Sequence, residues 1–252
     1  GVRVAIEWDE PSLCESLMAF LEGLWQSSPV SQVEACYRYV RKQDGRLILI
    51  SPEGEELSLS KADPGSSLEV HLQLYLATHT RQAAYVHSGV VGWQGGALVI
   101  PGRSYTGKST LVQALVEAGA SYFSDEYAIV DLQGQVHPYP RRLSRRGNEG
   151  KVERLDPVGA GWRVAHSPLP LRAVLSSPFE EGAIWQPEPL SRGESVLRML
   201  SNTVSARVAP EICLEALSRA VENAQGLQGP RGSAPEAARQ ILDYLGDAPW
   251  PS

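Results

Sequence analysis

The hydrophobic pattern of residues 1–80 predicts a small α+β accessory module. Alternating and helically spaced apolar residues predict strands over 2–6, 37–40 and 46–50, and helices over 13–25 and 68–78. Gln43, Asp44 and Gly45 separate two of these strands and favour a hairpin turn. The residues of this module do not indicate its role.

Residues 81–252 show a different pattern, in which short strands alternate with helices. Apolar runs predict strands over 85–91, 97–100, 122–123, 127–132, 135–137 and 171–176, and helices over 111–118, 196–200, 210–224 and 234–245. The polar, basic stretch 141–164 is interpreted as a long loop. The fold class predicted is α/β (α+β).

A glycine-rich motif lies between the second predicted strand of this domain and its first helix. Residues 102–109 (GRSYTGKS) match GxxxxGK[ST] at every fixed position. Glycines allow the backbone to point successive N–H groups at phosphate oxygens, and a helix N-terminus adds its positive end. The motif predicts a P-loop for a purine nucleoside triphosphate. The residues assigned to the nucleotide are Gly102, Ser104, Tyr105, Thr106, Gly107, Lys108, Ser109 and Thr110.

Two acids follow sixteen residues after the motif, at the end of a short predicted strand. Strand ends beside a phosphate loop are where carboxylates hold Mg²⁺ or accept a proton. We predict Ser109, Asp125 and Glu126 as Mg²⁺ ligands. Lys108 is expected to reach the β- and γ-phosphates. A solvated turn carrying two acids is the alternative.

Arginines and one histidine complete the set of candidate residues. Arg141 and Arg142 begin a run of four arginines within six residues, which could clamp a phosphate or an acidic substrate. A solvated loop is an equal alternative for this run. His87 lies on the strand before the motif strand, and by itself it is more typical of a structural histidine.

Composition narrows the classes of partner. The formal net charge of −6 does not attract nucleic acid or an anionic membrane surface, so neither is expected. The three cysteines have no CxxC spacing, which argues against a zinc site and a disulfide framework and favours a reducing cytoplasm. No apolar run approaches the roughly 20 residues that cross a bilayer.

Three segments together resemble the HPr kinase/phosphorylase superfamily: residues 87–91 (HSGVV), 96–110 (GALVIPGRSYTGKST) and 119–126 (GASYFSDE). The resemblance is closest to the HPr-kinase-like branch that tailors peptides, including lasso peptides. It implies a core related to ATP-dependent PEP carboxykinase, with a P-loop on a mainly antiparallel or mixed sheet in the second domain. It also implies His87 near the phosphates, Lys108 and Ser109 on nucleotide and metal, and Asp125 as base or metal ligand.

The resemblance further implies an activity: transfer of the γ-phosphoryl group of ATP to a serine-type hydroxyl of a peptide or protein, with Mg²⁺. Asp125, His87 and Lys108 would then be the catalytic residues, with Arg141 and Arg142 binding substrate. An alternative is a nucleotide-sensing module that binds ATP and gates a partner without transfer. A homo-oligomer agrees with the resemblance, although the sequence has no coiled-coil pattern.

Overall fold

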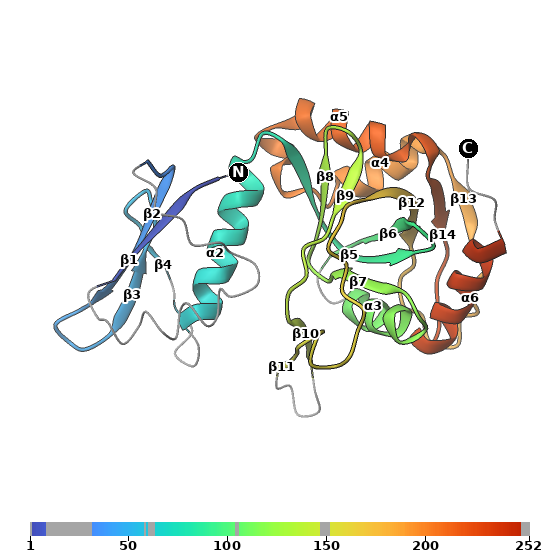
Figure 1. Cartoon of the computed structure of the whole chain (residues 1–252), viewed down its shortest axis with the longest axis horizontal. Coiled ribbons are helices and arrows are strands. Elements are labelled where there is room, and N and C mark those ends of the chain that lie inside the picture. Colours follow the sequence, from blue (N-terminus) through green and yellow to red (C-terminus); the bar gives the residue numbers. More distant parts are fainter. Residues whose placement is uncertain are drawn as a thin grey trace. The chain divides into compact units, whose positions relative to one another are not determined.

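The structure, a computed structural model, describes residues 2–8, 32–57, 59, 64–103, 106–146 and 152–247. The helix predicted over 13–25, and Ser104 and Tyr105 of the motif, lie outside these ranges. The chain divides into two compact units, Gly1–Thr80 and Arg81–Ser252 (Figure 1). Within the described ranges, no helix has both the length and the apolar character needed to cross a membrane.

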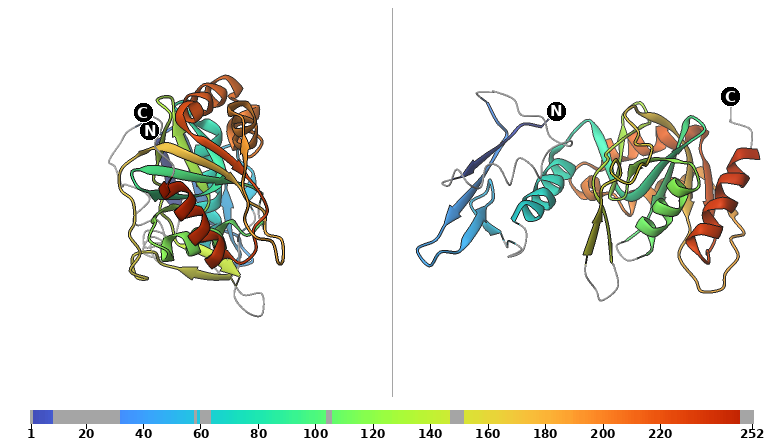
Figure 2. Two further views of the ribbon diagram at one scale, coloured as in Figure 1. Left: turned by 90° about the vertical axis from the view of Figure 1, so that its right-hand side faces the viewer. Right: turned by 60° about the horizontal axis from the view of Figure 1, so that its bottom comes forward.

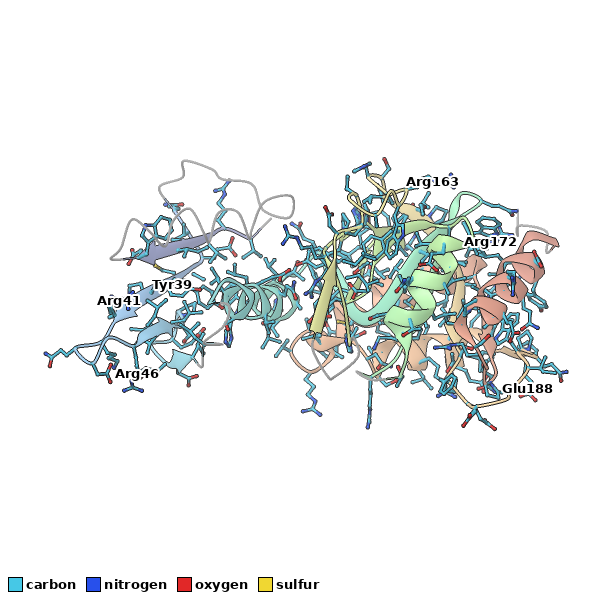
Figure 3. The ribbon with its side chains drawn as sticks, turned by 90° about the horizontal axis from the view of Figure 1, so that it is seen from below. Tyr39, Arg41, Arg46, Arg163, Arg172 and Glu188 are labelled. Carbon is cyan, nitrogen blue, oxygen red and sulfur yellow. The ribbon has the colours of Figure 1, made fainter. Side chains whose placement is uncertain are left out.

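The first unit is a four-stranded sheet with one described helix. Its elements are β1 (Val4–Trp8), β2 (Ala35–Arg41), β3 (Leu47–Ile50), β4 (Glu56–Leu57) and α2 (Pro64–His79), with strand order β1-β2-β3-β4. The predicted hairpin is present, because β2 and β3 pair antiparallel around Gly45, whose φ is 82°. Arg46, which is labelled in Figure 3, pairs with Asp44 at 2.7 Å in this turn. Buried Tyr39 and Leu68 belong to one core cluster that joins sheet and helix.

The second unit contains an eight-stranded mixed sheet, in the order β13-β14-β12-β6-β5-β8-β9 with β7 paired to β5. Its strands are β5 (Ala83–Trp93), β6 (Gly96–Pro101), β7 (Ser121–Ser124), β8 (Tyr127–Asp131), β9 (Gln135–His137), β12 (Leu169–Ser176), β13 (Glu188–Leu190) and β14 (Gln225–Gln228). β6, β12 and β14 run parallel, whereas β5 pairs antiparallel with β6, β7 and β8. The predicted mixed sheet is therefore confirmed.

Helices pack on both faces of this sheet. They are α3 (Lys108–Glu117), α4 (Arg192–Leu200), α5 (Pro210–Ala220) and α6 (Ala234–Asp247). Leu98 and Ile100 of β6 join a core with α3 and α6, whereas Ala97 and Val99 join a second core with α4 and α5. Figures 1 and 2 show the ribbons of these helices around the sheet. Side chains alternate between the two faces of a strand, so β6 is buried on both. This strand leads directly into the glycine-rich motif.

The stretch predicted as one long loop, 141–164, contains a hairpin instead. β10 (Leu143–Arg146) and β11 (Val152–Leu155) pair antiparallel within it. The loop interpretation was wrong here because Leu143 is fully buried in the core with α3, although its neighbours in the sequence are polar. Packing against the rest of the unit outweighs local polarity.

The C-terminal part differs from its prediction in a similar way. The helix predicted over 210–224 ends at Ala220, and a strand, β14, begins at Gln225. Gln225–Gln228 contains only one large apolar residue, so its sequence does not predict a strand. A Cβ at Gly226 would lie 2.1 Å from Ser195 Oγ, which shows how closely α4 approaches this strand.

Candidate active site

The glycine-rich motif forms the connection between β6 and α3. α3 begins at Lys108, and Gly107 precedes it with φ of 82°, a left-handed conformation that glycine adopts with little strain. At the other end of the connection, the Gly102 N–H donates to the His87 carbonyl at 3.3 Å. The described residues thus place a strand end, a tight turn and a helix N-terminus around one short loop, Gly102–Ser109, called the glycine-rich loop below.

Lys108 folds back across the glycine-rich loop. Its Nζ donates to the Arg103 carbonyl at 2.7 Å, and Thr106 Oγ1 donates to the same oxygen at 2.9 Å. Burial lowers the pKa of Lys108, while Glu126 and Asp125 act in the opposite direction. The loop therefore holds a buried cation next to the N-terminus of α3, and both features attract anions.

The acids are positioned by a serine turn. Ser124 Oγ accepts the N–H groups of Glu126 and Tyr127, both at 3.1 Å, which fixes the backbone between β7 and β8. This turn places buried Asp125 beside the start of α3. Ser109 Oγ donates to Asp125 Oδ2 at 3.4 Å. The structure thus brings these two predicted residues together.

Ser109 and Asp125 fit a magnesium ion. Octahedral Mg²⁺ has ligands at 2.0–2.1 Å, so neighbouring ligand oxygens lie about 3 Å apart, close to the observed 3.4 Å. The described residues hold no cluster of three or more His, Cys, Asp or Glu that could bind a metal by itself. Mg²⁺ normally takes one or two protein ligands and completes its shell with phosphate oxygens and water, so such a cluster is not required.

Glu126 points to different partners. Its Oε1 lies 3.5 Å from His87 Nε2, and its Oε2 lies 3.5 Å from Arg141 Nη1. The Arg141 side chain is 11% exposed, whereas Arg142 is exposed. Arg141 therefore belongs to the site, and no described contact links Arg142 to the other candidates.

His87 is neutral at pH 7. Burial, together with the positive charge of Lys108, lowers its pKa to about 4. Its contact with Glu126 is accordingly not an ion pair. A neutral imidazole can still donate or accept a hydrogen bond without adding charge to the site.

This buried imidazole predicts a specific dependence of stability on pH. Above pH 6.5, His87 is neutral in both the folded and the unfolded chain and contributes nothing. Below pH 6.5 the imidazole is protonated in the unfolded state, whereas in the folded state it stays neutral down to about pH 4. The free energy of unfolding therefore falls by up to about 3 kcal/mol as the pH is lowered over this range. Measured by urea unfolding at pH 7 and pH 4.5, the free energy of unfolding of His87→Gln should fall less between the two pH values than that of the wild type. His166→Gln, at an exposed position of the same unit, should behave like wild type.

Two residues near the site were missed from the sequence. Tyr122 is buried, and its hydroxyl oxygen lies 3.0 Å from both Asp125 Oδ1 and the Arg141 carbonyl oxygen, two acceptors for its single proton. Burial and the Asp125 charge raise the pKa of Tyr122 well above its usual value, so it remains a donor. Its position three residues before Asp125, on the strand that leads to the acids, is a signal that could have identified it.

Arg231 is the second residue that was missed. It is 2% exposed, and its Nη2 donates to the Gly107 carbonyl at 2.9 Å across 124 residues of sequence. Burial lowers its pKa. No spacing rule connects Arg231 with the glycine-rich loop, so only the fold reveals that a second buried cation supports the loop.

The contact between Gly107 and Arg231 can be tested with a matched pair of variants. A Cβ on Gly107 would lie 2.7 Å from Arg231 Nη2, whereas a Cβ on Gly95, with the same φ of 82°, would meet nothing within 4 Å. Gly95→Ala should cost about 1–2 kcal/mol from backbone strain alone. Gly107→Ala should cost about 1–3 kcal/mol more, because a buried hydrogen bond is disturbed. If both variants lose the same free energy of unfolding in urea, the contact between Arg231 and Gly107 does not contribute to stability.

Of the comparisons with known proteins, only the one with solved structures finds a similar protein. No protein-family model and no curated protein matches the chain. Among solved structures, the chain is similar to the HPr(Ser) kinase/phosphatase from Coxiella burnetii, with 15% identity, a TM-score of 0.38, and coverage of 65% of this chain and 99% of that one.

Proposed function

We propose that the second unit is an ATP-dependent kinase that transfers the γ-phosphoryl group to a serine-type hydroxyl of a peptide or protein. The observation that carries this proposal is that Asp125 lies against Ser109 of the glycine-rich loop, next to the buried Lys108. A buried cation, a hydroxyl and a carboxylate next to a helix N-terminus are the groups that phosphoryl transfer requires.

In the proposed reaction, the loop N–H groups and Lys108 bind the β- and γ-phosphates. Mg²⁺, held by Ser109 and Asp125, would neutralise charge on the phosphate oxygens. Asp125 orients the acceptor hydroxyl and takes its proton while the new O–P bond forms and the bond to the ADP oxygen breaks. Tyr122 keeps Asp125 in place through its hydrogen bond to Oδ1.

Arg141 and His87 have supporting roles in this proposal. Arg141 reaches Glu126 from the segment after β9, and its guanidinium can offset charge on the transferred group. Neutral His87 lies between Glu126 and the start of the loop and positions Glu126 without adding positive charge. Arg142, which is exposed, is proposed only to contact the acceptor at the edge of the candidate active site.

Mass spectrometry of serine-containing peptides incubated with the protein, ATP and Mg²⁺ tests the proposal. The expected result is the gain of one phosphoryl group by a peptide, with matching formation of ADP, and its loss when EDTA removes Mg²⁺. If ATP binds but no acceptor consumes it, the kinase proposal fails and the nucleotide-sensing alternative is favoured.

A further inference from the structure

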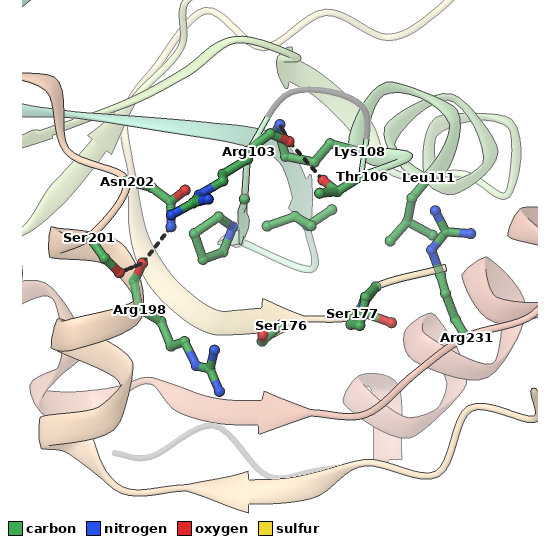
Figure 4. A pocket seen from close by; sticks show the side chains of 14 residues that line it. Arg103, Thr106, Lys108, Leu111, Ser176, Ser177, Arg198, Ser201, Asn202 and Arg231 are labelled. Carbon is green, nitrogen blue, oxygen red and sulfur yellow. Dashed lines mark hydrogen bonds between the residues drawn. The ribbon is translucent and has the colours of Figure 1, made fainter. Parts of the chain in front are cut away.

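A cavity of about 340 Å³ opens beside the glycine-rich loop, at the C-terminal end of β12 (Figure 4). It is lined by loop residues, by the end of β12, by the end of α4 and by Arg231. Asp125, Glu126, His87 and Ser109 are not among its lining residues. We call it the arginine cavity, after Arg103, Arg198 and Arg231.

The described charged side chains that line the arginine cavity are all positive. Arg103, Lys108, Arg198 and Arg231 line it, and no carboxylate is among the described lining residues. Hydroxyl and amide groups, including those of Ser177 and Asn202, provide further hydrogen-bond donors. A concave site with several guanidinium groups and no acid is suited to an oxyanion.

Two residues that line this cavity also carry a buried donor atom with no partner among the described residues. The atoms are Ser177 Oγ, on a residue that is 8% exposed, and Arg231 Nε, on a residue that is 2% exposed. Buried polar groups are nearly always hydrogen-bonded, so these donors leave hydrogen-bonding capacity unused behind the cavity wall. Because both atoms are themselves buried, the oxyanion is assigned to the charged groups of the lining and not to these two atoms.

The position of the cavity relates this ligand to the transferred phosphoryl group. Lys108 lines the cavity, and a P-loop lysine contacts the β- and γ-phosphates, so the cavity adjoins the γ end of a bound triphosphate. A second cavity of about 420 Å³ lies at the other end of the loop, against Gly107, Thr110 and exposed Phe179. Arg231 borders this cavity as well, but Arg103 and Arg198 do not, and the aromatic ring at its wall offers the nucleoside a place away from those two arginines.

We infer that the arginine cavity binds an oxyanion of the phosphoryl acceptor. The acceptor is then a peptide or protein that carries a phosphate or carboxylate group close to the reacting serine-type hydroxyl. This inference rests on the proposed kinase function and narrows its substrate class. Arg198 is the residue best suited to test it, because it lies exposed on α4 and its Nη2 donates to the Gln228 side chain at 3.2 Å.

The binding experiment uses protein saturated with Mg²⁺ and a non-hydrolysable ATP analogue, titrated calorimetrically with inorganic phosphate and, separately, with acetate. We expect at least one of the two anions to bind, and the tighter of them identifies the charged group as phosphate or carboxylate. Arg198→Gln should weaken that binding about tenfold or more without changing affinity for the analogue. Arg192→Gln, at the exposed start of the same helix and outside the cavity lining, should have no effect.

The transfer experiment compares serine-containing peptides as acceptors of the γ-phosphoryl group: two carry an aspartate or a phosphoserine beside the reacting serine, and a third carries alanine there. An anionic peptide should be preferred, and Arg198→Gln should remove the preference. The inference is overturned if neither anion binds beside the analogue, if Arg198→Gln leaves anion affinity unchanged, or if transfer does not depend on the acceptor's charge. If anions bind through Arg198 but no phosphoryl group is transferred to any acceptor, the kinase proposal fails and the anion site stands.

Discussion

Phosphoryl transfer is expected to fall by roughly 10²–10⁴-fold when Asp125 is replaced by asparagine, the range associated with loss of a positioned general base. The amide cannot accept the acceptor's proton and is a poorer ligand for Mg²⁺ than a carboxylate. It has nearly the same size, and its Oδ1 can still accept from the Tyr122 hydroxyl. The fold and the nucleotide affinity should therefore change much less than the rate.

The measurement is the initial rate of ADP formation with a competent acceptor, together with the Kd for ATP from calorimetry. Asp243→Asn is a suitable control, because Asp243 is an exposed residue of α6. A variant Asp125→Asn that transfers phosphoryl groups at the wild-type rate would remove Asp125 from the mechanism. Equal losses of rate and of nucleotide affinity would instead assign it to nucleotide and metal binding.

Much of this site could be predicted from the sequence because its parts are close in the chain. His87 lies on β5, the glycine-rich loop follows β6, and Asp125 follows β7. Because β6 and β7 both pair antiparallel with β5, the ends of β6 and β7 meet beside His87. A motif and a strand pattern within about 40 residues therefore locate the phosphate loop, the acids and the histidine together.

The rest depends on packing between distant segments. Arg231 reaches Gly107 only because β12 and β14 pair in parallel with each other beside β6, an arrangement that requires the helices between them. Neither β13 nor β14 has an alternating pattern that predicts a strand. The arginine cavity joins residues of the loop, α4 and Arg231, so no local pattern could have predicted it.

Replacing Lys108 with methionine is expected to weaken ATP binding about tenfold or more, since a charge-assisted contact to phosphate is lost. The catalytic efficiency should fall by roughly 10²–10³-fold, as when a preorganised donor is removed from a transition state. Stability should move in the other direction. Burial lowers the pKa of Lys108, which means that the folded protein holds this ammonium group at a cost in desolvation.

An apolar side chain of similar length avoids that cost, so Lys108→Met should unfold at an equal or higher temperature than wild type while binding ATP more weakly. Lys42→Met, at a half-exposed salt bridge in the first unit, should change neither the ATP affinity nor, by more than a small amount, the unfolding temperature. A variant Lys108→Met with lower stability and wild-type ATP affinity would show that the lysine stabilises the loop through its hydrogen bond to the Arg103 carbonyl. Gain of stability with loss of binding is what distinguishes a group retained for its ligand from one retained for the fold.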